Sequence, residues 1–585
     1  MSGLLRRDGV WIIVAVFTVA AVLRLVGLDW SLPNTEPFPH VESFHPDEWT
    51  IAHAVGRLNI FDGQMNPHFF NYGSLYIYFV YLLALPQQLI NPAGWNDLSG
   101  GWLTSVHLLG RLFTVLFGVS TVVLVWALGR RMFRSMVGLV AAVILTLMPI
   151  HIMHSHFMSV DVPLAFWSTL SLFLMIKALD KGSLKWFIYA SFVVGLATAT
   201  KYGVGPALLA ALFALAFTMR RRSRANILLR MQSWVLPVVA VVVGFLVGCP
   251  YSFFDPGTWW QHVSYELFQH ARTGHGLIFI DTGNGFWYHL VTNLPAALGW
   301  PLALLTFVAM GVTLIEVVAR KRMSLGNSDG RLSGNVGYDA MPQILLLVFA
   351  TAYFVPLGCA ELRFARYLMP LMPLLALLTA KIIVDFCSLW RRNATPVFIS
   401  IIGLVLIALV GLYTTGYALS IVSLFVRDDP RVQAARWLQP YANRGGAIAL
   451  AHVPWFYTPP ICPTNANNKW GWFDQWRTQS SNRIEVVGMG NDAFTQMPPD
   501  FYVISEFEYF DELRLKRPRA LSTFEWLEGN TELRSFKNDT SICGFRFGPS
   551  VLPHDMLYVN PEIRVYQFPK KWRSDKESGA PHKSE

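Results

Sequence analysis

About eleven apolar runs follow one another along the chain, and runs of this kind form helices that cross a bilayer core of roughly 30 Å. They cover residues 10–28, 105–128, 136–152, 161–178, 186–202, 205–219, 232–249, 293–318, 342–358, 366–387 and 396–421. Hydrophobic residues make up 53% of the sequence, charged residues only 14%, and the mean hydropathy is +0.38, which excludes an ordinary soluble domain. The sequence predicts a polytopic α-helical membrane protein with about eleven, and up to thirteen, transmembrane helices.

Basic residues occur in short clusters before the first run and after every second run. The clusters are Arg6-Arg7, Arg130-Arg131 with Arg134, Lys177 with Lys181 and Lys185, Arg220-Arg221-Arg222 with Arg224 and Arg230, Arg320-Lys321-Arg322 with Arg331, and Arg391-Arg392. If the N-terminus is cytoplasmic, all of them fall in cytoplasmic loops, as the positive-inside rule requires. We therefore expect a multi-pass protein of the inner (plasma) membrane, with segments 29–104 and 250–292 and everything after about 422 extracytoplasmic. The net charge of +10 comes from these clusters and does not indicate nucleic-acid binding.

One further apolar segment, Tyr72 to Pro86, bears on this topology. It is short for a transmembrane span, and counting it as one would place the later basic clusters outside. Because tyrosine-rich amphipathic helices are stable at the membrane interface, we interpret it as a juxtamembrane helix.

The composition divides the chain into parts. Residues 1–425 form the predicted transmembrane domain, in which 29–104 is the first extracytoplasmic loop. Residues 426–569 form a predicted C-terminal domain outside the membrane, and the polar tail 570–585 is predicted to be disordered.

Turns and short apolar runs in the C-terminal domain predict a small α/β or α+β fold. The domain contains only two cysteines, Cys462 and Cys543, and whether they form a disulfide is open. The predicted helix and strands lie at 429–438, 447–450, 501–504 and 563–566.

The first extracytoplasmic loop begins with an unusual acidic pair in the stretch Phe44-His45-Pro46-Asp47-Glu48. Charged side chains where membrane meets water usually mark a functional site. The alternative is structural, because Asp and Glu also favour the first turn of a helix, which here would start near Trp49.

More polar residues gather at the extracytoplasmic ends of the runs. Acids, cations and histidines around one cavity suit an anionic, polar substrate. Without a fixed ligand spacing, the histidines do not predict a metal site. The sequence requires no cofactor, and a divalent metal ion remains an open alternative. Residues expected to line the site on this basis are His154, His156 and Asp161, although Asp161 is also placed to cap a helix.

Several motifs together give the region 1–420 a resemblance to a known superfamily. They are the acidic pair after the first run, Asn66-Pro67-His68-Phe69-Phe70 followed by Tyr72, Asp161 two residues before Pro163, Gly195-Leu196-Ala197 followed by Lys201-Tyr202, and Arg366-Tyr367-Leu368-Met369-Pro370. In order and sidedness they resemble the C-type glycosyltransferases. The most similar branch is the protein-mannosyltransferase and aminoarabinose-transferase group, whose bacterial members take sugars from polyprenyl phosphate.

The resemblance implies roles for individual residues. An acid of the first outer loop acts as general base on an acceptor hydroxyl, and the sugar leaves its lipid phosphate with inversion. Asp47 is the expected base, while Glu48 is expected to orient it, hold the acceptor or help bind a metal. The residues expected to bind the donor phosphate are Lys201, Arg363, Arg366, His68 and Tyr72. For Lys201 and Arg366 the structural alternative is snorkelling at the span ends.

The predicted activity is therefore that of an integral-membrane hexosyl- or pentosyltransferase. Its partners are a polyprenyl-phosphate-linked sugar, the membrane lipid and an acceptor that is a protein, lipid or glycan. Two other classes stay open: a lipid-linked glycan ligase or polymerase, and a polytopic transporter. A transporter typically has a polar path near the middle of the membrane, whereas here the polar residues lie at one face.

Overall fold

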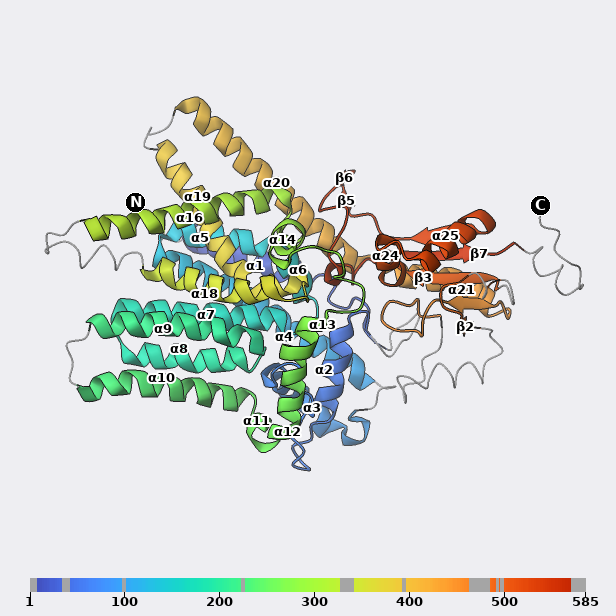
Figure 1. Cartoon of the computed structure of the whole chain (residues 1–585), viewed down its shortest axis with the longest axis horizontal. Helices are drawn as coiled ribbons and strands as arrows, with labels where there is room; N and C mark the ends of the chain where they lie inside the picture. Colours follow the sequence, from blue (N-terminus) through green and yellow to red (C-terminus); the bar gives the residue numbers. More distant parts are fainter. Residues whose placement is uncertain are drawn as a thin grey trace, which may run out of the picture.

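The computed structural model describes residues 8–33, 43–96, 101–222, 227–326, 341–391, 396–461, 484–490, 494 and 499–569. The chain forms a bundle of long helices with a smaller α/β domain at one end (Figure 1). The open question of a disulfide between Cys462 and Cys543 involves Cys462, which lies outside the described part, as do the residues 570–585 that are predicted to be disordered.

Every predicted apolar run falls on a helix of the bundle. The helices are α1 (Asp8–Leu25), α4 (Gly101–Met132), α5 (Ser135–Thr146), α6 (Pro149–Ser155), α7 (Asp161–Lys181), α8 (Leu184–Thr198), α9 (Gly205–Arg222), α10 (Ile227–Gly248), α15 (Leu294–Leu298), α16 (Trp300–Gly326), α18 (Met341–Cys359), η5 (Ala365–Leu371), α19 (Met372–Arg391) and α20 (Val397–Val426). Within the described residues, six helices are long and apolar enough to cross a membrane, or seven if the bent pair α5–α6 counts as one. A multi-pass membrane protein is thus confirmed, while the count of eleven to thirteen stays a prediction.

A buried arginine stabilises the break between α5 and α6, where the chain bends by 60°. The Arg24 guanidinium donates to the carbonyl oxygens of Leu145 and Thr146, at 3.1 and 3.3 Å. These carbonyls lie in the last turn of α5, where the carbonyl groups of a helix lack their regular partners four residues on. Arg24 also contacts Nδ1 of His151 at 3.0 Å, so a fully buried charge has polar partners on both sides of the bend.

Short helices lie across the outer ends of the bundle. In Figure 1, α2 (Pro46–Gly56) runs roughly perpendicular to α7–α10, as do α12 (Pro256–Ser264), the π-helical segment η3 (Tyr265–His270) and α13 (Ala271–Thr273). The predicted juxtamembrane segment is a helix, α3 (Leu75–Ile90), which is shorter than the helices that qualify as spans.

The C-terminal domain is a mixed five-stranded sheet between helices. The strand order is β2 (Ile484–Val486), β1 (Ile448–Leu450), β3 (Phe501–Ser505), β7 (Ile563–Gln567) and β4 (Glu532–Phe536). The β1–β2 and β1–β3 pairs are parallel, and β7 is antiparallel to both of its neighbours. The predicted helix and the three predicted strands are all present.

Alternating side chains of the strands form two separate cores, one on each face of the sheet. Val503 and Val565 pack with α21 (Pro430–Ala442), whereas Tyr502 and Tyr566 pack with α24 (Glu506–Arg514) and α25 (Pro518–Asn530). The domain is therefore a three-layer α/β structure.

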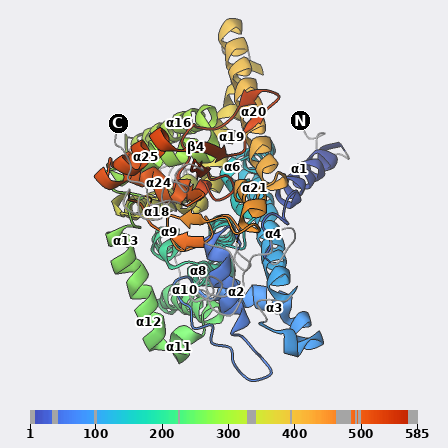
Figure 2. The ribbon, with the colours of Figure 1, turned by 90° about the vertical axis from the view of Figure 1, so that its right-hand side faces the viewer.

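A second buried arginine fixes this domain against the first outer loop. Arg431 binds both carboxylate oxygens of Asp429, and it donates to the carbonyl oxygens of Phe456 and Tyr558. Its guanidinium carbon lies 3.9 Å from the ring centroid of Phe44, two residues before the start of α2. Figure 2, with the domain toward the viewer, shows it over the ends of the central helices, with α11–α13 on one side and α3 on the other. Helix α11 spans Tyr251–Phe254.

Candidate active site

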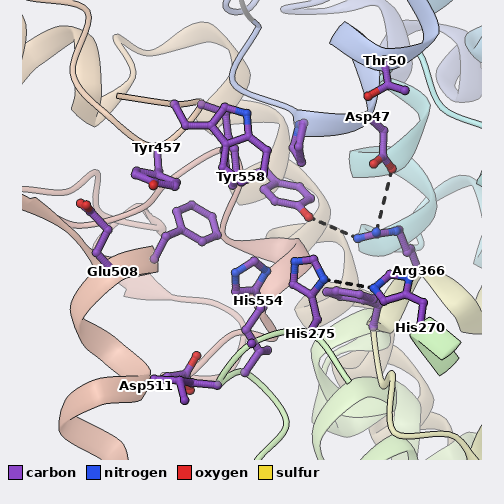
Figure 3. Close-up of a pocket in the computed structure, with 18 of the residues that line it drawn as sticks. Asp47, Thr50, His270, His275, Arg366, Tyr457, Glu508, Asp511, His554 and Tyr558 are labelled. Carbon is purple, nitrogen blue, oxygen red and sulfur yellow. Dashed lines mark hydrogen bonds and ion pairs between the residues drawn. The ribbon is translucent and has the colours of Figure 1, made fainter. Parts of the chain in front are cut away.

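A cavity of about 510 Å³ lies between the C-terminal domain and the end of the helical bundle that faces it. Its wall combines residues from four parts of the chain that are distant in sequence (Figure 3). The polar and aromatic residues that line it include Asp47, Thr50 and Tyr72 from the first loop, Lys201, Arg366 and Tyr367 from the bundle, Glu266, His270 and His275 from the segment after α12, and Trp455, Tyr457, Glu508, Asp511, His554 and Tyr558 from the C-terminal domain.

Asp47 lies in the first turn of α2 and points into the cavity. The helix starts here because Pro46 suits the first helical position and the Nδ1 atom of His45 accepts the N–H of Asp47 at 3.3 Å. The structural alternative considered for the acidic pair is thus also realised, since the helix does begin at this point. The Asp47 side chain is 17% exposed, which leaves its carboxylate accessible from the cavity.

The pKa of the Asp47 carboxyl reflects opposing influences. Burial raises it, but the guanidinium of Arg366 and the charges of His45 and Lys201, together with a hydrogen bond from Tyr72, outweigh burial and hold the pKa below its ordinary value. Asp47 is therefore ionised near neutral pH and able to accept a proton or a hydrogen bond.

Glu48 points in a different direction from Asp47, because neighbouring residues of a helix project about 100° apart. It is completely buried, and both its oxygens bind Arg111, at 2.8 and 2.7 Å. It also accepts the N–H of Met158 at 2.7 Å. Burial raises its pKa, but the ion pair with Arg111 outweighs this and lowers the pKa of Glu48 to about 2. The structure does not bring Glu48 to the cavity, where the predicted base-orienting, acceptor-binding and metal-binding roles would place it.

Arg366 lies among three carboxylates near the start of η5. Its guanidinium nitrogens stand 3.9 Å from Asp47, 3.9 Å from Asp161 and 3.8 Å from Asp555. It also donates to the hydroxyl of Tyr558 at 3.3 Å. None of the three carboxylates makes a short contact with the guanidinium, so its charge is shared among several partners and it has room for an additional anion.

Lys201 supplies the second strong positive charge of the cavity. Its ammonium donates to Asp161 at 2.8 Å and lies 4.6 Å from the ring centroid of Tyr367. Asp161 itself is buried in the first turn of α7 and does not line the cavity, but it connects Lys201 with Arg366. Asp161 begins α7, but Val160 occupies the N-cap position and Asp161 makes no capping hydrogen bond among the described residues. Its role in the structure is to hold the two cations near each other.

The other sequence-predicted residues lie elsewhere. Arg363 donates to Thr282 and Glu361, at 2.5 and 3.0 Å, and His68 is exposed in its loop. His156 stacks on Phe425 with the ring centroids 3.9 Å apart. His154 is fully buried, and its ring nitrogens have no hydrogen-bond partner within the described part of the chain. Of the predicted site residues, the structure brings Asp47, Tyr72, Lys201 and Arg366 to the cavity.

Residues 104–246, from α4 to α10, match the family described as dolichyl-phosphate-mannose-protein mannosyltransferase. The described fold is also that of a solved membrane glycosyltransferase, the oligosaccharyltransferase AglB from Archaeoglobus fulgidus, in complex with an inhibitory peptide and a dolichol-phosphate. The TM-score is 0.50 at 12% identity, over 94% of this chain and 75% of that one. Over residues 104–246 the chain is thus similar to the protein-mannosyltransferase family. The predicted resemblance is thereby confirmed.

Two further comparisons complete the picture. The Archaeoglobus fulgidus oligosaccharyltransferase tethered to an acceptor peptide has a TM-score of 0.50 and 13% identity, over 95% of this chain and 76% of that one. ArnT from Cupriavidus metallidurans bound to undecaprenyl phosphate has a TM-score of 0.45 and 15% identity, over 94% of this chain and 97% of that one. No curated protein sequence matches the chain. At these identities the two oligosaccharyltransferase structures show the fold of this chain and no more.

Sequence reasoning missed two parts of the cavity wall. One is a hydrogen-bonded chain on and beside η3, in which Glu266 contacts His270 at 3.0 Å and His270 contacts His275 at 3.2 Å. The predicted topology placed 250–292 on the same side as Asp47, so these side chains were identifiable as candidates. The other part is the C-terminal domain, whose cavity residues carry no motif that marks them.

The described residues contain no group of three or more His, Cys, Asp or Glu side chains placed to hold a metal ion. In particular, His270 lies between Glu266 and His275 as a link in a chain, so the three do not converge on one point.

Proposed function

We propose that the protein transfers a sugar from a polyprenyl-phosphate donor to an acceptor hydroxyl on the extracytoplasmic face, with inversion, and that Asp47 is the general base. The observation that carries the proposal is one cavity in which an ionised, accessible carboxylate adjoins two cations, Lys201 and Arg366. The similarity of residues 104–246 to a mannosyltransferase family supports sugar transfer as the reaction. The place of these charges at the ends of the helices suits a lipid-linked donor.

The donor phosphate is expected to bind Lys201, Arg366 and the phenol of Tyr72. As the bond between the sugar and the phosphate breaks, negative charge develops on the phosphate, and cations placed there in advance stabilise it. Because Arg366 stands 3.9 Å from Asp47, an incoming phosphate competes with that carboxylate for the guanidinium. Donor binding would thus free Asp47 for the acceptor.

The acceptor hydroxyl attacks the anomeric carbon from the face opposite the phosphate. Its oxygen forms the new bond to that carbon, and the polyprenyl phosphate leaves with the electron pair of the broken bond. Asp47 takes the hydroxyl proton as the new bond forms. Attack from the opposite face inverts the configuration at the anomeric carbon.

The acceptor is expected to enter from the side of the C-terminal domain. There the cavity wall changes character, from the cations of the bundle to aromatic and acidic side chains such as Trp455, Tyr457 and Glu508. This wall suits a polar acceptor with hydroxyl groups, and a protein, a lipid and a glycan all provide such groups.

The test is transfer from a panel of radiolabelled polyprenyl-phosphate sugars, in inverted and right-side-out vesicles, by wild type and Asp47→Asn. The matched control is Asp62→Asn, since Asp62 is an exposed carboxylate of the same loop. We expect transfer that depends on Asp47 and not on Asp62, and its donor identifies the sugar. Near-normal transfer by Asp47→Asn would show that another group is the base. A panel without any Asp47-dependent transfer would favour the ligase or transporter instead.

The membrane orientation is tested separately with an impermeant thiol reagent in a cysteine-free background. Thr50→Cys in the cavity and Asp539→Cys in the C-terminal domain should react from outside the cell. Lys185→Cys, at an exposed position in the first turn of α8, should react only after the membrane is opened. Labelling with the opposite sidedness would contradict the proposed topology and the face on which the cavity opens.

A further inference from the structure

The C-terminal domain contacts the proposed phosphate-binding region through the short element η6 (His554–Met556) and through Tyr558, which follows it. Asp555 at its centre is completely buried, although it belongs to a different domain from the helix that it contacts. Its two carboxylate oxygens accept the backbone N–H groups of Ala365 and Arg366, at 3.0 and 2.8 Å. The carboxylate of one domain therefore binds the first residues of a helix in the other.

These backbone N–H groups need an outside partner. The first N–H groups of a helix have no acceptor within the helix, and leaving them buried without one is costly. The residue before η5, Phe364, makes no side-chain capping bond to them. Asp555 supplies the missing acceptors from the C-terminal domain, and its negative charge is favourable at the positive end of the helix.

The same segment also contacts the side chain of Arg366. The hydroxyl of Tyr558, three residues after Asp555, accepts from the guanidinium at 3.3 Å, and Asp555 lies 3.8 Å from it. The backbone carbonyl of Tyr558 is in turn bound by Arg431, which begins α21. Both the backbone and the guanidinium of Arg366 are thus attached to the C-terminal domain.

We infer that Asp555 is a positioning residue for the transfer reaction, through which the C-terminal domain orients Arg366 toward the donor phosphate. The inference rests on the proposed function, because it assumes that Arg366 binds that phosphate. It also assigns the C-terminal domain a part in the donor site in addition to its wall facing the acceptor.

Asp555→Asn is the informative variant, because it keeps the size of the side chain and removes one of the two acceptors. The amide nitrogen then faces a backbone N–H, so the start of η5 loses a hydrogen bond and Arg366 loses its fixed place. The probe is undecaprenyl phosphate. We expect its Kd to be about 10-fold to 100-fold higher for Asp555→Asn than for wild type, as for the loss of a charge-assisted hydrogen bond. Asp539→Asn, an exposed carboxylate of the same domain, should leave the Kd unchanged.

A double-mutant cycle separates positioning from a general loss of structure. Kd for undecaprenyl phosphate is measured on purified full-length wild type, Asp555→Asn, Arg366→Lys and the double variant, with the melting temperature of each recorded. If Asp555 acts through Arg366, the double variant binds no more weakly than Arg366→Lys alone. If Asp555 is only structural, the two losses multiply, and the inference is overturned.

The remaining outcomes distinguish the inference from the proposed function. If wild type binds undecaprenyl phosphate and Arg366→Lys weakens the binding while Asp555→Asn does not, the inference fails and the proposed function stands. If Arg366→Lys binds as tightly as wild type, or if wild type does not bind the probe, the proposed donor site is wrong, and the inference falls with it.

Discussion

The floor of the cavity, where Asp47 lies near Arg366, and the core beneath α2, where Glu48 binds Arg111, both contain an acid and an arginine. The two pairs differ in their contacts and in their exposure. In the core, Arg111 donates hydrogen bonds to both carboxylate oxygens of Glu48, at 2.7 and 2.8 Å, and no part of either side chain is exposed. On the floor, Arg366 stands 3.9 Å from Asp47, and 17% of the Asp47 side chain is exposed.

The difference shows which charges are available for chemistry. Glu48 already has its strong partner and an additional backbone donor, so a substrate has little to offer it. Asp47 and Arg366 are held near each other without a short hydrogen bond, and each retains capacity for an acceptor hydroxyl or a phosphate. Two adjacent acids in the sequence thus have separate roles, one in stability and the other in the proposed reaction.

The sharpest test of this contrast is Asp47→Asn. We expect the rate of transfer to fall by about 10²-fold to 10⁴-fold, the usual contribution of a general base. The melting temperature should stay close to the wild-type value, because Asp47 makes no buried ion pair at short distance. Undecaprenyl phosphate should bind at least as tightly as to wild type, since the carboxylate that competes for Arg366 is gone. A large drop in melting temperature would mean that Asp47 and Arg366 contribute to the stability of the fold as Glu48 and Arg111 do.

Glu48→Gln should produce the opposite result. It leaves the fully buried Arg111 without its negative partner, which costs about 3–5 kcal/mol of unfolding free energy. Transfer per folded molecule should remain near the wild-type rate. Melting of the detergent-solubilised protein checks this, with Glu532→Gln on an exposed strand as control. Because the pKa of Glu48 is lowered on folding, the wild-type advantage is full above the ordinary glutamate pKa and is lost as pH falls toward about 2.

Lys201→Met and Arg363→Gln compare a cation that lines the cavity with one that does not. Lys201→Met should lower kcat/KM for the donor about 10-fold to 100-fold, mainly through KM, since it removes one charge that holds the phosphate. Arg363 does not line the cavity and pairs with the half-exposed Glu361, so its substitution should change kcat/KM less than about 5-fold. Equal losses in the two variants would show that the phosphate extends to Arg363.

The smallest expected effect is a shift of the acid limb of kcat/KM against pH. In wild type this limb should lie below the ordinary aspartate pKa, because Arg366 holds the pKa of Asp47 down against burial. Arg366→Gln removes the largest lowering charge, so the limb should move to higher pH by about 1 to 3 units. Lys201→Met should move it in the same direction by less. A limb unchanged in Arg366→Gln would mean that a group other than Asp47 controls it.

Much of the architecture was predictable from local patterns. Apolar runs predicted the helices of the bundle, because a bilayer admits few other ways to satisfy the backbone. Short apolar runs bounded by turns predicted strands at 447–450, 501–504 and 563–566, and the structure has them at 448–450, 501–505 and 563–567. The number of transmembrane helices was less accessible, since length and hydropathy do not separate a tilted or broken span from a buried helix. The segment 136–152 illustrates this, because it bends at Pro149 into two helices.

The site was predictable only in part. The cavity contains four of the predicted residues, Asp47, Tyr72, Lys201 and Arg366. It does not contain Glu48, Arg363 or His68. Sidedness places a residue on a membrane face, and it does not say which way the side chain points. Asp555 was beyond sequence reasoning altogether, because its partners at 365 and 366 are backbone groups nearly two hundred residues away.

The sequence by itself determined a membrane-embedded helical protein with a small α/β domain and an acidic pair at the entrance of its first loop, because periodicity, hydropathy and charge act locally. The tertiary structure decided which acid of the pair meets the cavity, which cations share it, and that the C-terminal domain closes over them. Those outcomes depend on helix rotation and domain packing, in which a turn of about 100° between neighbours separates a residue open to substrate from one buried in an ion pair.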